Sequence, residues 1–431
     1  MDLPAIVKVL SVFAGILLAI RLRVPLGIGL TVGGLLLGAW AGRSPAELVG
    51  DLGMALTRID LWLLLVVIAL IVELGRFLAE DRNATAIMAA ARRFGGRHGR
   101  ALSLMALPAF IGLVPMPGGA LFSAPLVGQT VREPHWNPAW KAAINYWFRH
   151  VWEYWWPLYP VVILTLSIFD ISTARFMAAL VPLSLLAILS GYLFLVRPHI
   201  GQLAEGEAPT SDGWRRALFL AIPILTIVLA TLLLPPLLVM VRPAWSGQTP
   251  RLAAMLLGML VGLGLIFWDE RHKLDHVPFA HLCKPQTLNI LASLAGVLLF
   301  ESLLQRSGLV PLAGQELASS GIPVGVIVAA LPFVAGLVTG IAIGFAGPAF
   351  PLVVGLLAAP ASTLTPMATL ALAFGFGYAG MMLSPVHLCF VLTRDYFATP
   401  FRGIYRHILP CVLVLLFGSL ALFLAFGHLG W

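Results

Sequence analysis

The segment "NYWFRHVWEYWWP", residues 145–157, places polar side chains inside an otherwise apolar stretch. Arg149 and Glu153 are four residues apart, so on a helix they share one face and can form an ion pair. The guanidinium fork suits a carboxylate, and a buried carboxylate can carry a proton. Asn145 lies one turn before Arg149, and Pro157 breaks the helix beyond Glu153. The pattern predicts a site for a small organic anion, with Glu153 taking up the coupling ion.

The tryptophans of this segment allow two other interpretations. They are typical of an interfacial aromatic belt, in which Arg149 would extend to the membrane surface. They could also form a cation–π box for a cationic or zwitterionic solute, although the charge of Arg149 opposes this. The tryptophans in question are Trp147, Trp152, Trp155 and Trp156.

The composition bounds the class of protein. Of 431 residues, 60% are hydrophobic and 11% are charged, whereas soluble proteins have about 25% charged residues. This predicts an all-α polytopic protein of the cytoplasmic (inner) membrane, with the lipid bilayer as its surroundings. The net charge of +8 lies in short loops, which is typical of cytoplasmic loops and not of nucleic-acid binding. The three cysteines form no CxxC pair, so we expect packing residues and neither a metal site nor a cofactor.

Ten stretches are long enough to span a bilayer, which takes about 20 apolar residues. They are residues 4–20, 25–40, 60–79, 142–169, 173–196, 216–240, 252–268, 286–305, 367–393 and 407–428.

Two further apolar stretches, residues 101–130 and 322–360, are broken near the middle by proline and glycine. Irregular backbone at membrane depth must be surrounded by protein or a watery cavity. We therefore expect two re-entrant hairpins whose turns offer N–H groups to an anion. The expected substrate contacts are Pro117, Gly118, Gly119 and Ser123 in the first hairpin and Gly344, Gly347 and Pro348 in the second. Ser384 and His387, beside the helix break at Pro385, are expected to join Asn145 and Arg149 at the same site.

The two halves of the chain match in order. "ALPAFIGLV" (106–114) corresponds to "ALPFVAGLV" (330–338), and the span before each hairpin carries one acid, Glu73 or Glu301. Either acid could carry a coupling ion, or it could simply neutralise Arg76 or Arg306. Counting spans gives the halves, 1–200 and 201–431, opposite orientations, which is the inverted repeat typical of secondary transporters.

These motifs resemble the membrane family of unknown function 401, which is grouped in the ion transporter superfamily with gluconate, citrate and dicarboxylate permeases. The resemblance covers essentially the whole chain. It implies an elevator-type transporter that works as a homodimer. The hairpin turns lack the Ser-Asn-Thr motif of sodium-coupled dicarboxylate members, so we expect H+ rather than Na+ as the coupling ion.

Other classes fit less well. The chain has no HExxH motif for a zinc protease and no Walker A motif for ATP-driven transport. An inverted repeat favours alternating access over a passive channel. The sequence therefore predicts a secondary transporter and not an enzyme.

Loop charges predict the orientation. The arginine-rich loop 76–100 belongs in the cytoplasm, which leaves both termini and the loop 41–59 outside. In variants whose native cysteines are removed, Gly95→Cys and Glu47→Cys should be labelled by an impermeant maleimide from opposite sides. Labelling of both positions from the same side would contradict this topology.

Overall fold

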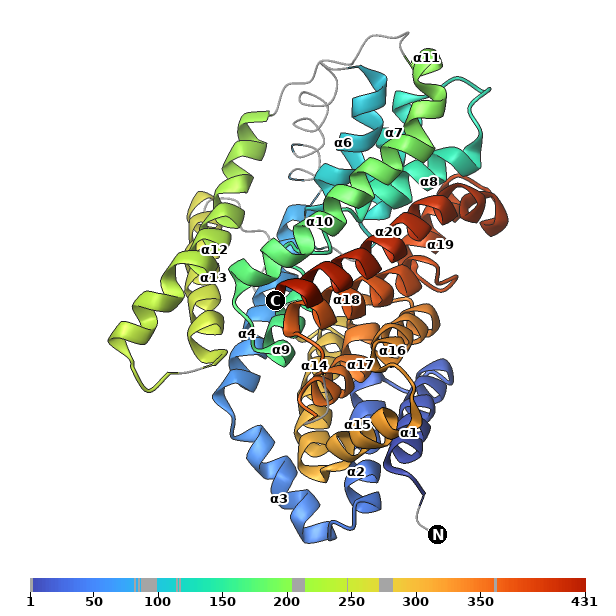
Figure 1. The fold of residues 1–431 in the computed structure, drawn as a ribbon. Helices are drawn as coiled ribbons and strands as arrows, with labels where there is room; N and C mark the ends of the chain where they lie inside the picture. The colour runs from blue at the N-terminus through green and yellow to red at the C-terminus, as the bar shows by residue number, and fades with distance from the viewer. Residues whose placement is uncertain are drawn as a thin grey trace.

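The computed structural model describes residues 3–80, 83, 86, 99–113, 115, 118–203, 214–245, 247–270, 282–359 and 363–431. Regular structure within these residues is entirely helical (Figure 1). The first half contains α1 (Ala5–Arg21), α2 (Leu26–Trp40), α3 (Pro45–Leu56), α4 (Ile59–Ala79), α6 (Arg100–Gly112), α7 (Ala120–Thr130), α8 (Pro138–Arg149), α9 (Pro160–Phe169), α10 (Thr173–Gly191), the short helices η1 (Tyr192–Val196) and η2 (Arg197–His199), and α11 (Ile200–Leu203). The second contains α12 (Trp214–Val241), α13 (Thr249–Glu270), α14 (Pro285–Ser307), α15 (Leu309–Ser320), α16 (Val324–Thr339), α17 (Ala342–Leu357), α18 (Pro366–Met382), α19 (Leu388–Tyr396) and α20 (Phe401–Leu429).

Helices occupy all ten stretches in which the sequence predicts spans. By length and composition, six helical segments of the described chain can cross a membrane: α4, α10 with its continuation to Leu203, α12, α13, α14 and α20. The exposed face of α12 carries a row of large apolar side chains, including Leu225, Leu229 and Leu233. Such a face suits contact with lipid.

Two helices were not expected from the sequence, α3 and α15. Ser44 and Glu47 form a capping box at the start of α3. Glu316 of α15 accepts hydrogen bonds from the backbone N–H groups of Ala5 and Ile6, both at 2.8 Å. This carboxylate satisfies donors that α1 itself leaves open at its first turn.

Each proline- and glycine-rich stretch forms a pair of helices. The first pair, α6 and α7, turns before Gly119, and the second pair, α16 and α17, turns at Gly340 and Ile341. The expected second turn at Gly344–Pro348 was placed wrongly, because these residues lie inside α17. Gly340, with φ of +65°, ends α16 in the left-handed conformation that glycine adopts without strain.

Two spans are interrupted at proline. Between α8 and α9 the chain runs in turns through Pro157, and between α18 and α19 it does so through Pro385. In both places the helix ends several residues before the proline. Backbone groups at these ends are released from helical hydrogen bonding and can bind side chains.

Packing pairs helices from the two halves of the chain. Helix α2 packs on α14 and α4 on α13, while α7 packs on α19 and α17 on α9. Helices α10 and α20 lie side by side in the middle of the molecule (Figure 1). The interrupted helices and both helical pairs therefore meet in the interior.

The crossing of α2 and α14 depends on two glycines. A Cβ atom on Gly296 would collide with the backbone of Gly27, and one on Gly27 would collide with the carbonyl of Ala292. Small residues let membrane helices approach closely and gain van der Waals contact.

We expect Gly296→Val to force α2 and α14 apart and to destabilise the fold by about 1–3 kcal/mol, the usual cost of overpacking. Gly264→Val on α13 is the matched control, since a Cβ there has no neighbour within 4 Å. Thermal unfolding of both variants in detergent, followed by tryptophan fluorescence, would measure the difference. Equal midpoints for the two variants would contradict the tight crossing.

Candidate functional site

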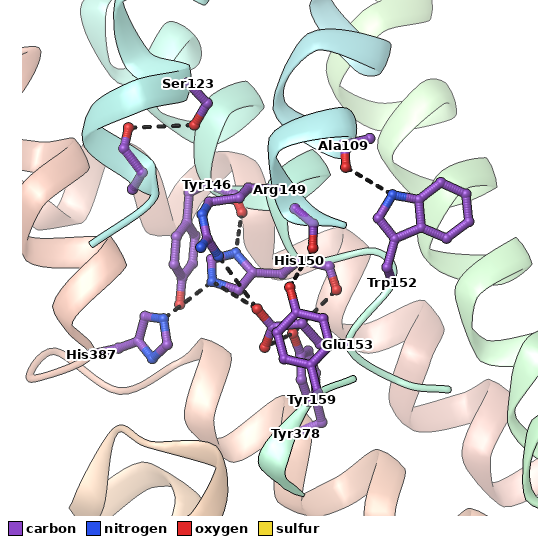
Figure 2. Close-up of polar contacts among 12 residues, drawn as sticks. Ala109, Ser123, Tyr146, Arg149, His150, Trp152, Glu153, Tyr159, Tyr378 and His387 are labelled. Atoms are coloured by element: carbon purple, nitrogen blue, oxygen red, sulfur yellow. Dashed lines mark hydrogen bonds and ion pairs between the residues drawn. The ribbon is translucent and has the colours of Figure 1, made fainter. Parts of the chain in front are cut away.

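A buried ion pair lies where α8 ends. Arg149, the last residue of α8, and Glu153 in the following turns are only 2% and 6% exposed. The Arg149 Nη1 atom lies 3.4 Å from Glu153 Oε1, and the Tyr378 hydroxyl donates to Glu153 Oε2 at 3.0 Å. Burying either charge alone would be strongly unfavourable, so the two residues must be paired. Figure 2 shows the pair among the aromatic hydroxyls that surround it.

A pair of histidines connects the two interrupted spans. His150, directly after α8, has its Nε2 atom 3.2 Å from Nε2 of His387, the residue that precedes α19 (Figure 2). The other ring nitrogens contact backbone oxygens: His150 Nδ1 is 2.6 Å from Tyr146 O, and His387 Nδ1 is 2.7 Å from Gly340 O. The histidine pair thus links α8, the α18–α19 break and the α16–α17 turn.

Cys389 completes this group of side chains. Its Sγ and one ring nitrogen from each of His150 and His387 all lie within 4.8 Å of one another. All three side chains are buried, so a cation between them would be shielded from water. The sequence analysis interpreted Cys389 as a packing residue, because no second cysteine accompanies it in the sequence.

Both helical pairs contact the interrupted spans directly. At the end of α6, Gly112 lies so close to the carbonyl of Arg149 that any side chain on it would collide. The hydroxyl of Tyr159 donates a hydrogen bond to Gly112 O. At the α16–α17 turn, a Cβ on Gly340 would lie 2.8 Å from His387 N and 2.9 Å from Ser384 Oγ. Glycine is therefore required at both contacts, because each backbone approaches its neighbour too closely for a Cβ.

Asn145 joins the first helical pair to the second interrupted span. Its side-chain nitrogen donates to Ala120 O of α7 at 3.2 Å and to Thr393 Oγ1 of α19 at 3.0 Å. Its Oδ1 is buried with no hydrogen-bond partner in the described part of the chain, and so is Ser384 Oγ. A buried acceptor without a partner is costly and is a feature that ligand sites retain.

The structure brings one group of the expected site residues together. The residues at the two span interruptions are Arg149, Glu153, Ser384 and His387. Asn145 lies one turn earlier in α8 and binds α7, whose start carries Gly118, Gly119 and Ser123. Pro117 is outside the described residues. Tyr378, Tyr159 and Cys389 also belong to this group. The sequence analysis missed them, although Tyr159 closely follows Pro157 and Cys389 closely follows His387.

The remaining expected residues lie elsewhere. Gly344, Gly347 and Pro348 are buried inside α17, and a Cβ on Gly347 would meet Val297 of α14 at 2.7 Å. Glycine at this position is explained by helix packing.

The two lone acids have different surroundings. Glu73 of α4 pairs with Arg76 at 3.6 Å, as one of its two interpretations expected. Glu301 of α14 accepts a hydrogen bond from Gln305 at 3.2 Å, whereas Arg306 pairs with the buried Asp51 of α3 at 3.4 Å. The expected pairing of Glu301 with Arg306 was wrong, because the unpredicted helix α3 supplies the carboxylate.

The aromatic belt also fails as an account of this segment. Trp147 is buried and donates through Nε1 to Ala187 O at 2.8 Å, and Trp152 donates to Ala109 O at 2.8 Å. Arg149 is buried as well, so it does not extend to a membrane surface. Trp147 thus fixes α8 against α10, and Trp152 fixes the turns after α8 against α6.

Helices of this length and apolarity, packed around buried charges, define a multi-pass helical membrane protein. A family profile matches residues 8–247 and 281–425, and the chain belongs to that family, described as protein of unknown function (DUF401). No curated protein matches the chain.

A solved structure of similar fold is that of the YdaH transporter from Alcanivorax borkumensis, reported to have an unusual topology. The TM-score is 0.51 and the sequence identity 15%, over 89% of this chain and 88% of that one. At this identity the likeness concerns the fold.

We expect Gly340→Ala to disturb the α16–α17 turn more than an equivalent change elsewhere. Alanine in the left-handed conformation costs about 1–2 kcal/mol wherever it occurs. Gly321 has a φ of +73°, also ends a helix and has open space around it, so Gly321→Ala measures that cost alone. The contact with His387 should add about 1–3 kcal/mol for Gly340→Ala, measured by thermal unfolding. Equal losses for both variants would show that the turn does not rest on His387.

Proposed function

We propose that this protein is a secondary active transporter that moves a small organic anion, most simply a carboxylate, across the cytoplasmic membrane. The observation that carries the proposal is the buried Arg149, which lies between the end of α6 and two interrupted spans. Discontinuous helices at matching positions are where secondary transporters place their substrates. The fold likeness to a transporter supports the same class.

The pairing of helices supports an inverted repeat made of residues 1–200 and 201–431. Helix α2 packs on α14 while α4 packs on α13, as expected if α4 corresponds to α14 and α2 to α13. Likewise α7 packs on α19 and α17 on α9. A two-fold axis in the membrane plane would relate the α2–α14 contact to the α4–α13 contact, and the α7–α19 contact to the α17–α9 contact. Repeats related in this way support alternating access. In the elevator form of this proposal, the helical pairs and interrupted spans move together within a homodimer whose termini lie outside.

The charges of the site favour an anion. Glu153 Oε1 already pairs with Nη1 of Arg149, and Glu153 Oε2 accepts a hydrogen bond from the Tyr378 hydroxyl. Arg149 carries a positive charge on a planar guanidinium, whose geometry suits a carboxylate. Helix α7 begins at Ala120, next to Asn145, and its N-terminal N–H groups suit the same charge.

The coupling ion in this proposal is a proton, with Glu153 as its carrier and Glu73 and Glu301 as reserve carriers. Two carboxylates held by one arginine repel each other, and protonation of Glu153 would relieve that repulsion as the anion binds. A cationic or zwitterionic solute is the second candidate, but Trp147 and Trp152 already bind backbone oxygens within the fold. An enzyme or a channel lacks a comparable supporting observation.

The test is anion binding by variants of Arg149. A ligand at 100 times its dissociation constant stabilises a protein by about 2.7 kcal/mol, so a thermal-shift screen of monocarboxylates, dicarboxylates and citrate should find the substrate class. Arg149→Ala removes one partner of a desolvated pair and should cost about 2–5 kcal/mol of binding, or at least about 30-fold in affinity. Uptake of the same anion into proteoliposomes should fall in parallel.

Three further variants make the result specific. Arg149→Lys keeps the charge and the fold but loses the bidentate fork, so it should bind more weakly than the wild type. Glu153→Gln keeps the shape of its side chain and should retain anion binding while losing the part of the pH dependence that Glu153 contributes. Arg402→Ala, at an exposed position, should change nothing. Normal uptake by a folded Arg149→Ala variant would refute the anion site.

A further inference from the structure

The two ring contacts of the histidine pair fix where its protons lie. A carbonyl oxygen can only accept a hydrogen bond, so each Nδ1 that contacts one must carry a proton. The contacts with Tyr146 O and Gly340 O therefore make Nδ1–H donors of both His150 and His387. In a neutral imidazole the other nitrogen, Nε2, is then an acceptor with no hydrogen.

Local backbone structure explains why these two oxygens are available. The His150 N–H bonds Trp147 O at 3.1 Å, which leaves Tyr146 O to the His150 ring. Gly340 ends α16 at a turn, so no following helical N–H uses its oxygen. Both Nδ1 contacts are therefore consequences of where the helices end.

Two neutral rings would place two acceptor lone pairs face to face. The Nε2 atoms of His150 and His387 lie only 3.2 Å apart, a normal hydrogen-bond distance that needs one donor. We propose that His150 and His387 together hold one proton between their Nε2 atoms, which gives the pair a single positive charge. The proton replaces a repulsion between lone pairs with a charge-assisted hydrogen bond.

The groups that face the pair fit a monovalent cation. They come from several elements: Tyr146 and Arg149 from α8, Glu153 from the turns after it, Tyr159 from the residue before α9, Tyr378 from α18 and Cys389 from α19. Glu153 Oε1 lies 3.9 Å from His150 Nε2 and gives the nearest negative charge, yet it is also bound by Arg149. A divalent metal would also require Cys389 to bind as a thiolate, whereas a proton between the rings leaves the Cys389 thiol unchanged.

As a coupling site, the pair rests on the proposed transport function and deepens it. With Arg149 and Glu153 balanced, the shared proton leaves the site with one positive charge, which a monovalent anion would neutralise. The two rings come from opposite halves of the chain. Any motion that separates them must break the shared hydrogen bond, so occupancy by the proton depends on the conformation.

The test is the protonation state of the rings in the full chain, in lipid nanodiscs and without added anion. Magnetic-resonance spectra of the protein with 15N-labelled histidine distinguish protonated from bare ring nitrogens, and a shared proton gives coupling between the two Nε2 atoms. We expect that coupling in the wild type. His387→Gln should abolish it and leave a bare Nε2 on His150, whereas His428→Gln, at an exposed position of α20, should retain it.

Two outcomes would overturn the proposal. One is a pair of bare Nε2 atoms without coupling, which would mean two neutral and separated rings. The other is one metal ion per purified chain, detected by mass spectrometry, that is lost in His387→Gln and kept in His428→Gln. Neither result depends on transport, so the shared proton and the anion site of Arg149 can fail separately.

Discussion

The buried ion pair of Arg149 and Glu153 is the constraint on which the interior of this protein depends. Two charges removed from water are stable only when further polar groups complete their hydrogen bonding. Here the hydroxyl of Tyr378 donates a hydrogen bond to Glu153 and also contacts the backbone oxygen of His150, just beyond α8. An unbroken helix offers no spare backbone groups to such a site. Ending α8 at Arg149 provides them, and the bulky aromatic residues that follow keep out water.

Glycine and proline make this arrangement possible from both sides. Both interruptions contain proline, which disfavours regular helix there, and glycine in the two helical pairs allows backbone to touch backbone. Gly112 lies against the carbonyl of Arg149, and Gly340 lies against the backbone N–H of His387. The stability of these irregular segments comes from burial among neighbouring helices, which replaces the hydrogen bonds that a regular span would make for itself.

The sequence predicts the helical class and the two broken stretches because both depend on local chemistry. Apolar length, proline and glycine are visible in any short window. The Arg149–Glu153 pair was expected on one helix that breaks beyond Glu153, and that part was wrong: the pair forms across the end of α8, because the helix stops at Arg149. Contacts between segments that are distant in the chain were harder to predict from the sequence. Nothing near Tyr378 in the chain signals a polar neighbour, and the closeness of His387 to Cys389 in the sequence does not show that their side chains meet. Asp51 could be paired with Arg306 only once α3 was known. The second turn was misplaced because Pro348 and Gly347 look like breakers, although α17 accommodates them against α14.

The histidine contact places a limit on how the halves of the molecule can move. His150 follows a helix of the first half, His387 precedes a helix of the second, and their rings meet only while Gly340 and Tyr146 hold the opposite nitrogens. If the helical pairs and interrupted spans travel as one body, this contact persists and any bound cation travels with them. If instead the α16–α17 turn opens alone, Gly340 leaves His387, and the ring loses the bond that fixes its tautomer. A cation held between the rings would then be released by a local opening, and the larger motion would only determine the side of the membrane on which this happens.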